Sequence, residues 1–445
     1  MRLLPVWAGI LISLATGSMT AATGLANSLR FEELIRQGRA AFLAADPERA
    51  ESAYSEACPA DAVRAYSVAE AVTCENLLAS VDEARGNLAR AEQRYREAAL
   101  LAEQAGMAYQ PIYCARLIDL GEYYHRRGRM EAAEQTLQRA AGLARRLTAS
   151  VPDLLPKALI RLGSLYADSP HPERGRAPLA EALTLANPAK LSAAEVAFAQ
   201  NAMGKVELAC GHAREAEPHL RDAVSFAERT LGEEHPATAA YQTNLAMALI
   251  AERQFGRARL LLRRAQYILE SKNRAPGLQL AAVCAELAAV AASEGKMAEA
   301  EDYAMRSLSI LHLQPELHAV TVAAAKVTLA SVYIRLHDLR AADSILPEAV
   351  EVERRQAVNP QTLAASIQLL AELRVEQRDW GAAEALYREA AAASGGGNAP
   401  VLRALAAVLK QEGGSTQEIR SLEQEAREIS RTGARAVKSQ SPEGT

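Results

Sequence analysis

The stretch that decides the fold runs from residue 231 to residue 265 and reads LGEEHPATAAYQTNLAMALIAERQFGRARLLLRRA. It contains a small residue, Ala246, and a second small residue, Ala258, twelve positions later. Leu262 follows four positions beyond, and Ala265 three beyond that. Side chains three or four positions apart share one face of a helix. The spacing therefore predicts two helices, joined by a tight turn and packed against each other through small residues.

The same pattern recurs along most of the chain. The small residue of the first helix returns every 41 or 42 positions, with a last step of 35, at Gly38, Ala79, Gly121, Gly163, Gly204, Ala246, Ala288, Ala330, Ala371 and Ala406. The second small residue follows twelve positions later at Ala50, Ala91, Ala133, Gly175, Ala216, Ala258, Ala300, Ala342 and Ala383, and fails at Glu418. A fixed period of this length is the signature of a helical repeat array.

The turn between the two helices has its own sequence signal. Seven positions after the small residue, several repeats carry glycine, among them Gly86, Gly128, Gly211 and Gly295. Glycine at this place suits the end of a helix, where a left-handed backbone closes the last turn. Arg253, His337 and Arg378 occupy the same position in three other repeats.

These residues resemble the tetratricopeptide repeat (TPR). The 42-residue period, the segment Leu231 to Thr238 and the Asn244-Leu245-Ala246 that follows look like the kinesin-light-chain-like variety found in bacterial proteins. The resemblance spans about residues 30 to 430. It implies an all-α, right-handed TPR superhelix (an α-solenoid) of about ten helix-turn-helix repeats, with the first helices lining a concave surface.

The ends of the chain depart from the repeat. Met1 and Arg2, an apolar run over 3–17 and small residues up to Ala26 predict a signal peptide over 1–26, the alternative being an uncleaved anchor. The solenoid is expected over 27–430, with a degenerate cap as its last repeat, and 431–445 are expected to be a disordered tail. We expect an exported protein, periplasmic or secreted in a bacterium, with no membrane insertion beyond the signal peptide.

Composition and motifs narrow the function. The 445 residues carry a formal net charge of −4, which argues against nucleic acid as the partner. The eight histidines form no H-E-x-x-H or similar ligand pair, and no catalytic motif is present. The glycine-rich stretch over 394–400 lacks the Lys-Ser/Thr of a phosphate-binding loop and is interpreted as a connector. We therefore expect no enzyme, no metal and no cofactor.

The five cysteines are Cys58, Cys74, Cys114, Cys210 and Cys284, and none forms a C-x-x-C pair. Cys58 and Cys74 lie 16 positions apart across a loop and are a candidate disulfide in an oxidising compartment. Cys74 with Cys114 is the rival pairing, because their separation of 40 nearly equals one repeat. The sequence leaves both open.

A binding groove is the remaining site candidate. From the resemblance, positions −3, +1 and +4 relative to the small residue of each first helix face the concave side. The most convergent cluster there is Asn201, Lys205, Asn244 and Met247, which could hold a peptide backbone or carboxylate beside an apolar patch. The alternative is an ordinary polar surface.

The sequence thus predicts a non-enzymatic exported scaffold that binds a protein or peptide in the concave groove, in the assembly of a larger complex. The alternative is a ligand-sensing regulator whose superhelix responds to a peptide or small molecule.

Overall fold

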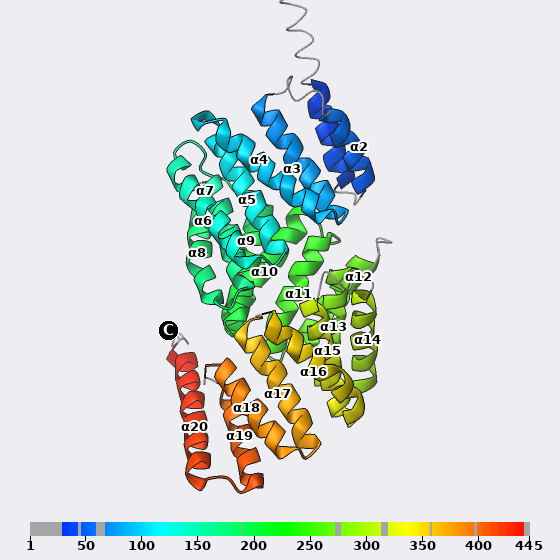
Figure 1. Cartoon of the computed structure of the whole chain (residues 1–445), viewed down its shortest axis with the longest axis vertical. Coiled ribbons are helices and arrows are strands. Elements are labelled where there is room, and N and C mark those ends of the chain that lie inside the picture. Colours follow the sequence, from blue (N-terminus) through cyan, green and yellow to red (C-terminus); the bar gives the residue numbers. More distant parts are fainter. Residues whose placement is uncertain are drawn as a thin grey trace, which may run out of the picture. The chain divides into compact units, whose positions relative to one another are not determined.

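The computed structural model describes residues 29–42, 46–58, 67–187, 189–271, 277–312, 319–356, 358–395 and 398–439, with side chains described up to 431. Every regular element in these ranges is a helix (Figure 1), so the predicted all-α solenoid class is confirmed. The predicted signal peptide over 1–26 lies outside the described residues.

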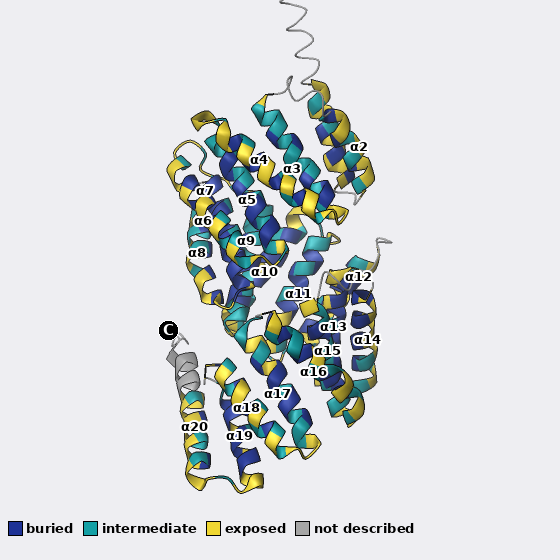
Figure 2. Ribbon diagram, viewed as in Figure 1, coloured by how far each residue is buried: buried dark blue, intermediate teal, exposed yellow. Residues whose placement is uncertain are grey.

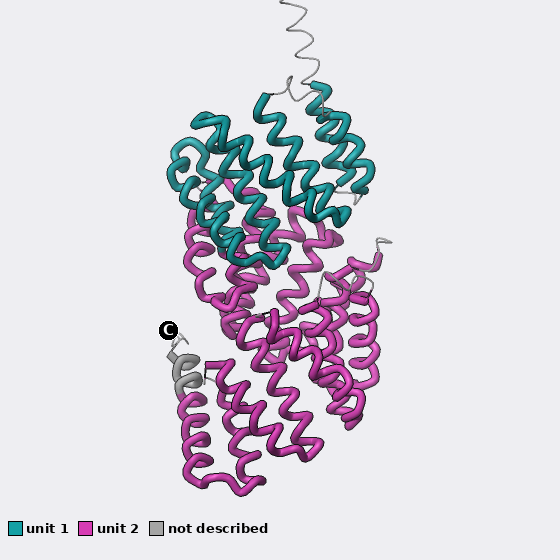
Figure 3. Tube along the Cα trace, in the orientation of Figure 1, with its two compact units in different colours: residues 1–162 teal, residues 163–445 magenta. Residues whose placement is uncertain are grey.

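The chain divides into two compact units, residues 1–162 and 163–445, whereas the sequence predicts one array over 27–430 (Figure 3). Unit 1 begins with a helix over 29–42. It continues with α2 (Pro47–Ala57), α3 (Val68–Ala84), α4 (Leu88–Gln104), the short 3-10 helix η2 (Met107–Tyr109), α5 (Gln110–Arg126) and α6 (Met130–Leu147). The boundary between the units falls inside α7 (Leu154–Ala167).

Unit 2 continues the helical hairpins. Its elements are η3 (Pro172–Gly175), α8 (Arg176–Leu185), α9 (Ala193–Ala209), α10 (Ala213–Thr230), α11 (Pro236–Ala251), α12 (Phe255–Glu270), α13 (Leu278–Ser293), α14 (Met297–Leu311), α15 (Ala319–Arg335), α16 (Leu339–Arg355), α17 (Pro360–Glu376), α18 (Trp380–Ala393), α19 (Ala399–Glu412) and α20 (Thr416–Ser439). Each hairpin pairs an odd-numbered first helix with the even-numbered second helix that follows, as α9 does with α10.

The small residues are the points of closest approach within each hairpin. A Cβ added to Gly204 would lie 2.4 Å from Cγ of Leu220, and one added to Gly121 would lie 2.6 Å from Cγ of Leu137. In both cases the partner is the large apolar residue sixteen positions later, and it is fully buried. Figure 2 shows buried residues recurring along the helices. Because interiors are close-packed, only glycine leaves room for the leucine at these two positions.

The fourth repeat explains one irregularity of the sequence. Its second helix is broken into η3 and α8, and Gly175 stands where most repeats have alanine. A Cβ on Gly175 would lie 2.9 Å from the carbonyl oxygen of Gly163 and 2.7 Å from Cγ2 of Val206. Backbone cannot move aside cheaply, so this position requires glycine.

The predicted turn position adopts the left-handed backbone in every repeat for which it was predicted. Gly86, Gly128, Gly211 and Gly295 have φ between 68° and 81°, and Arg253, His337 and Arg378 have φ of 61°, 58° and 62°. The left-handed conformation costs a non-glycine residue about 1–2 kcal/mol. The hairpin geometry is therefore kept even where the sequence does not offer glycine.

The C-terminal end differs from the prediction. Helix α20 continues to Ser439, past residue 430, where the sequence predicts the solenoid to end. The segment over 431–439 contains no proline, and its alanines and arginines favour helix without any hydrophobic period. Residues 440–445 lie outside the described chain.

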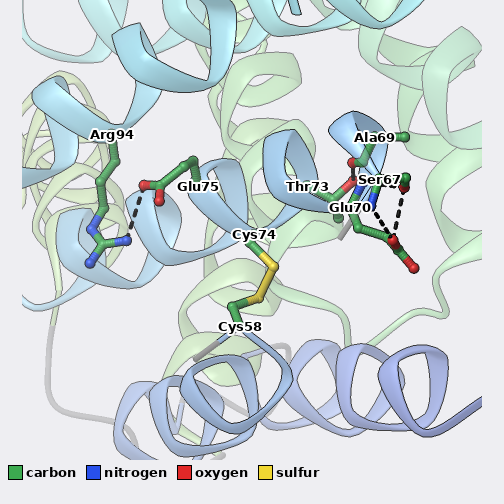
Figure 4. The surroundings of a disulfide bond; sticks show 8 residues. All are labelled: Cys58, Ser67, Ala69, Glu70, Thr73, Cys74, Glu75 and Arg94. Atoms are coloured by element: carbon green, nitrogen blue, oxygen red, sulfur yellow. Dashed lines mark hydrogen bonds and ion pairs between the residues drawn. A yellow bond between two sulfur atoms is a disulfide. The ribbon is translucent and has the colours of Figure 1, made fainter. Parts of the chain in front are cut away.

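A disulfide joins Cys58, the residue that ends α2, to Cys74 in α3 (Figure 4). Their Cα atoms are 5.8 Å apart, within the range that disulfides span. In the chain-entropy model, closing a loop of this length stabilises the fold by about 3 kcal/mol. The rival partner, Cys114, is buried, and its Sγ donates to the carbonyl oxygen of Ala140 at 3.4 Å.

The start of α3 is fixed by neighbouring contacts. Ser67 and Glu70 form a capping box, in which each side chain bonds to the backbone N–H of the other. Arg94 of α4 donates to Glu75 at 3.1 Å, beside the disulfide (Figure 4). These contacts hold α3 in place between the disulfide and α4.

Thiol counting tests the pairing. Alkylation of the denatured chain without reductant is expected to label three thiols, those of Cys114, Cys210 and Cys284, and five after reduction, as read by intact mass. In the folded chain Cys210 should react first, because burial shields Cys114 and Cys284 and raises the pKa of each thiol to about 11. Labelling of all five thiols without reductant would contradict the disulfide.

Candidate functional site

Consecutive first helices of unit 2 contact each other directly, as α9 does with α11 and α11 with α13. Residues at equivalent positions of neighbouring repeats are therefore brought side by side. We call the partly exposed stripe of α9, α11 and α13 the first-helix face. It contains Asn201, Lys205, Asn244, Met247 and Glu286.

The structure brings the two predicted asparagines together. Nδ2 of Asn244 donates to Oδ1 of Asn201 at 2.8 Å, which links α11 to α9. Asn201 is only 6% exposed, so its amide is held in place by packing as well as by the bond. The pair uses one donor and one acceptor. Within the described chain, Nδ2 of Asn201 and Oδ1 of Asn244 have no further hydrogen bond.

Lys205 lies one turn beyond Asn201 on α9, but its charge is already compensated. Its Nζ lies 3.0 and 3.3 Å from the two carboxylate oxygens of Asp168. A ligand carboxylate would have to displace Asp168 to use this ammonium group. The structure therefore places Lys205 beside the asparagines and gives it a structural partner that the sequence did not suggest.

Met247 lies one turn from Asn244 on α11 and is 41% exposed. It is the apolar element that the sequence predicts next to the amides. An unbranched, polarizable side chain of this kind adapts to differently shaped partners.

Glu286 was missed by the sequence analysis, although it lies on α13 exactly one 42-residue step after Asn244. It is the sole acidic residue of α11, α13 and α15. No hydrogen bond or ion pair reaches it from the described chain, and burial alone raises its pKa to about 7. Glu286 stands at −2 relative to Ala288, outside the positions −3, +1 and +4 that the resemblance assigns to the concave side, and Asn244 stands likewise at −2 relative to Ala246.

In unit 1, the acidic residues Glu83 and Glu122 of the first helices are paired with arginines. Arg126 of α5 donates to both carboxylate oxygens of Glu83 at 2.8 and 2.7 Å, and Tyr95 donates to the same group at 3.2 Å. Glu122 pairs with Arg126 at 3.3 Å and accepts from Arg161 at 2.8 Å. These acidic groups are neutralised within the protein, in contrast to Glu286.

Other kinds of site find no support in the described ranges. No group of three or more His, Cys, Asp and Glu side chains there is arranged to hold a metal ion. Among the same residues, no helix combines the length and the apolar character that a membrane span requires.

The geometry defines an α-solenoid of helical hairpins with a polar first-helix layer. Residues 195–271 match the family model described as tetratricopeptide repeat, and they include Asn201, Lys205, Asn244 and Met247. The tetratricopeptide repeat is therefore shown for residues 195–271, and the same period continues in the sequence from Gly38 to Ala406, in agreement with the resemblance.

Two solved structures with TM-scores above 0.5 agree on the fold. A Rap protein complexed with Competence and Sporulation Factor is 13% identical, covers 83% of this chain and 97% of its own, and has a TM-score of 0.61. The apo form of RapI is 12% identical over 73% of this chain and 85% of its own, with a TM-score of 0.52. BtubC (BKLC) from P. vanneervenii is 19% identical over 51% of this chain and 92% of its own, with a TM-score of 0.43. No curated protein matches the sequence significantly.

Glu286 predicts a pH dependence of stability. Its pKa in the folded chain, about 7, lies above the ordinary value of 4.5, so its proton is lost on unfolding between these values. The ionisation of Glu286 leaves the free energy of unfolding unchanged below pH 4.5 and lowers it increasingly as the pH rises to about 7. Across this pH window, urea unfolding should show the free energy of unfolding of Glu286→Gln rising by roughly 1–3 kcal/mol relative to the parent. Partial solvent access of Glu286 lowers the upper end of this range.

Taking the difference between the unfolding free energies of the variant and the parent cancels the contributions of the histidines and the other carboxyl groups, because both proteins contain them. A pH-independent difference between Glu286→Gln and the parent would contradict the assignment.

Proposed function

We propose that this protein is a non-enzymatic scaffold that binds an extended segment of a partner protein along the first-helix face, in the assembly of a larger complex. The observation that carries the proposal is the Asn201–Asn244 amide pair, which leaves the NH2 group of Asn201 and the amide oxygen of Asn244 unused, with the uncompensated Glu286 on the neighbouring helix α13. Paired amide groups of this kind suit the alternating C=O and N–H groups of a peptide backbone.

The amide pair provides backbone recognition at little entropic cost. Asn201 is buried and bonded, so its side chain loses almost no freedom when a ligand arrives. Its Nδ2 can donate to a peptide carbonyl, while Oδ1 of Asn244 can accept from a peptide N–H. Because Lys205 is held by Asp168, we do not assign it the capture of a carboxylate.

Glu286 supplies the side-chain preference. Burying a carboxylate with no cation near it costs free energy, and no group of the described chain compensates for this cost. A lysine or arginine of the bound segment would provide the missing charge. Packed helices lie about 10 Å apart, and extended peptide rises about 3.3 Å per residue, so this basic residue should follow the part held by the asparagines by about three positions.

Two further observations support the proposal. The Rap protein of similar fold is described in complex with Competence and Sporulation Factor, so a fold of this kind accommodates a bound factor. Met247 offers an exposed apolar contact beside Asn244.

Export is part of the proposal. The predicted signal peptide over 1–26 and the Cys58–Cys74 disulfide both suit an oxidising compartment outside the cytosol. The intact mass of the chain recovered from its host envelope should correspond to a start at Asn27. A mass that retains Met1 would count against cleavage.

Peptide selection tests the binding function. A random peptide library displayed against immobilised residues 27–445 should enrich segments containing lysine or arginine. Isothermal titration with a selected peptide should show Asn201→Ala/Asn244→Ala and Glu286→Gln each weakening the affinity by tenfold or more, with helicity unchanged. Asn187→Ala, which removes an exposed asparagine from the turn after α8, is the matched control.

Charge reversal separates this account from simple loss of packing. Glu286→Lys should reject the basic peptide and accept one in which the basic residue is replaced by glutamate. Unchanged binding by Asn201→Ala/Asn244→Ala, or enrichment of peptides without basic residues, would contradict the proposed site.

A further inference from the structure

A cavity of about 480 Å³ lies in unit 1, where the end of α4, the η2 turn, the start of α5 and the second half of α6 meet. Its volume falls in the range of small-molecule sites. The lining includes Glu103, Met107, Tyr113, Arg139, Gly142 and Arg146. None of these residues belongs to the first-helix face of unit 2, so the cavity is a separate candidate site.

The hydroxyl group of Tyr113 gives the first indication that the cavity binds a ligand. Tyr113 is only 8% exposed, and its hydroxyl oxygen is buried without a hydrogen bond in the described structure. A buried hydroxyl without a partner is destabilising, because it has lost its hydrogen bonds to water. Burial, together with the neighbouring Glu103 carboxylate, raises the pKa of Tyr113 to about 12, so the hydroxyl keeps its proton and can donate.

The charges around the cavity are unequal. Arg139 donates to Glu103 at 2.6 Å, and its guanidinium lies 5.3 Å from the centre of the Tyr113 ring. Arg146 makes one long bond, 3.4 Å, to the carbonyl oxygen of Gly142, and no acidic group of the described chain pairs with it. Two guanidinium groups and one carboxylate leave one net positive charge.

The remaining wall is apolar and open. Leu143, Ala102 and Met107 provide aliphatic surface, and Met107 is 84% exposed. A Cβ on Gly142 would meet nothing within 4 Å, so the glycine borders free space.

We propose that this cavity binds one carboxylate group attached to a short apolar chain. The guanidinium of Arg146 pairs with the carboxylate, the hydroxyl of Tyr113 donates to it, and Leu143 and Met107 cover the apolar part. A single carboxylate matches the single uncompensated charge, and planar guanidinium groups bind carboxylates through two parallel hydrogen bonds. The same chemistry is presented by a free carboxylic acid and by the C-terminus of a peptide.

Titration calorimetry of the folded chain with two probes and their neutral amides tests the site. Hexanoate represents the free acid, and acetyl-Ala-Ala-Leu with a free C-terminus represents the peptide end. At least one acid is expected to bind and its amide to bind at least tenfold more weakly; the acid that binds identifies the source. Failure of both acids, or equal binding of acid and amide, overturns the proposal.

Three variants separate binding from folding. Arg146→Gln should lose at least tenfold in affinity for the acid, whereas Arg145→Gln, one position away and outside the lining, should retain it. Gly142→Leu should block the cavity while the chain stays helical.

Tyr113→Phe is the most informative variant, because it removes a hydroxyl whose oxygen is buried without a hydrogen bond in the described part of the chain. It should weaken binding several-fold and leave the urea midpoint equal or higher. A lower midpoint would show that the hydroxyl serves the fold, and unchanged affinity would show that it does not serve the ligand; either result overturns its assigned role.

Discussion

The contact between a small residue of the first helix and the large apolar residue sixteen positions later is the interaction on which the rest of the structure depends. At Gly204 and Gly121 this residue, a leucine, occupies the space that a Cβ would need. The contact sets how closely the two helices of a hairpin pack. Its return every 41 or 42 residues lets each hairpin bury the side of the next, which an isolated hairpin could not do.

Repetition also places the functional residues. Because consecutive first helices lie side by side, Nδ2 of Asn244 comes within 2.8 Å of Oδ1 of Asn201 although 43 residues separate them. Function then arises where the array leaves a group without its partner. Glu83 and Glu122 are neutralised by neighbouring arginines, whereas Glu286 and the Tyr113 hydroxyl are left without a partner in the described structure.

The period predicted the helices, the hairpin turns and the asparagine pair, because these depend on local spacing and on the repeat. The helical stretch over 431–439 was not predicted, because beyond Ile429 the sequence carries Val437 as its sole large apolar residue and so leaves little periodic signal. The bond between Lys205 and Asp168 spans 37 residues and follows from side-chain reach, which no spacing rule contains. Glu286 and the Tyr113 cavity were missed because an absent partner shows only once all neighbours are placed.

The small-residue contact is tested most directly by two identical substitutions in unit 2. Gly204→Ala should lower the free energy of unfolding in urea by about 1–3 kcal/mol, because its Cβ would meet Leu220. Gly256→Ala, in α12 with nothing within 4 Å of the new Cβ, should leave stability unchanged or raise it by about 0.5–1 kcal/mol. Equal effects of the same sign in both variants would contradict the close approach on which the array is built.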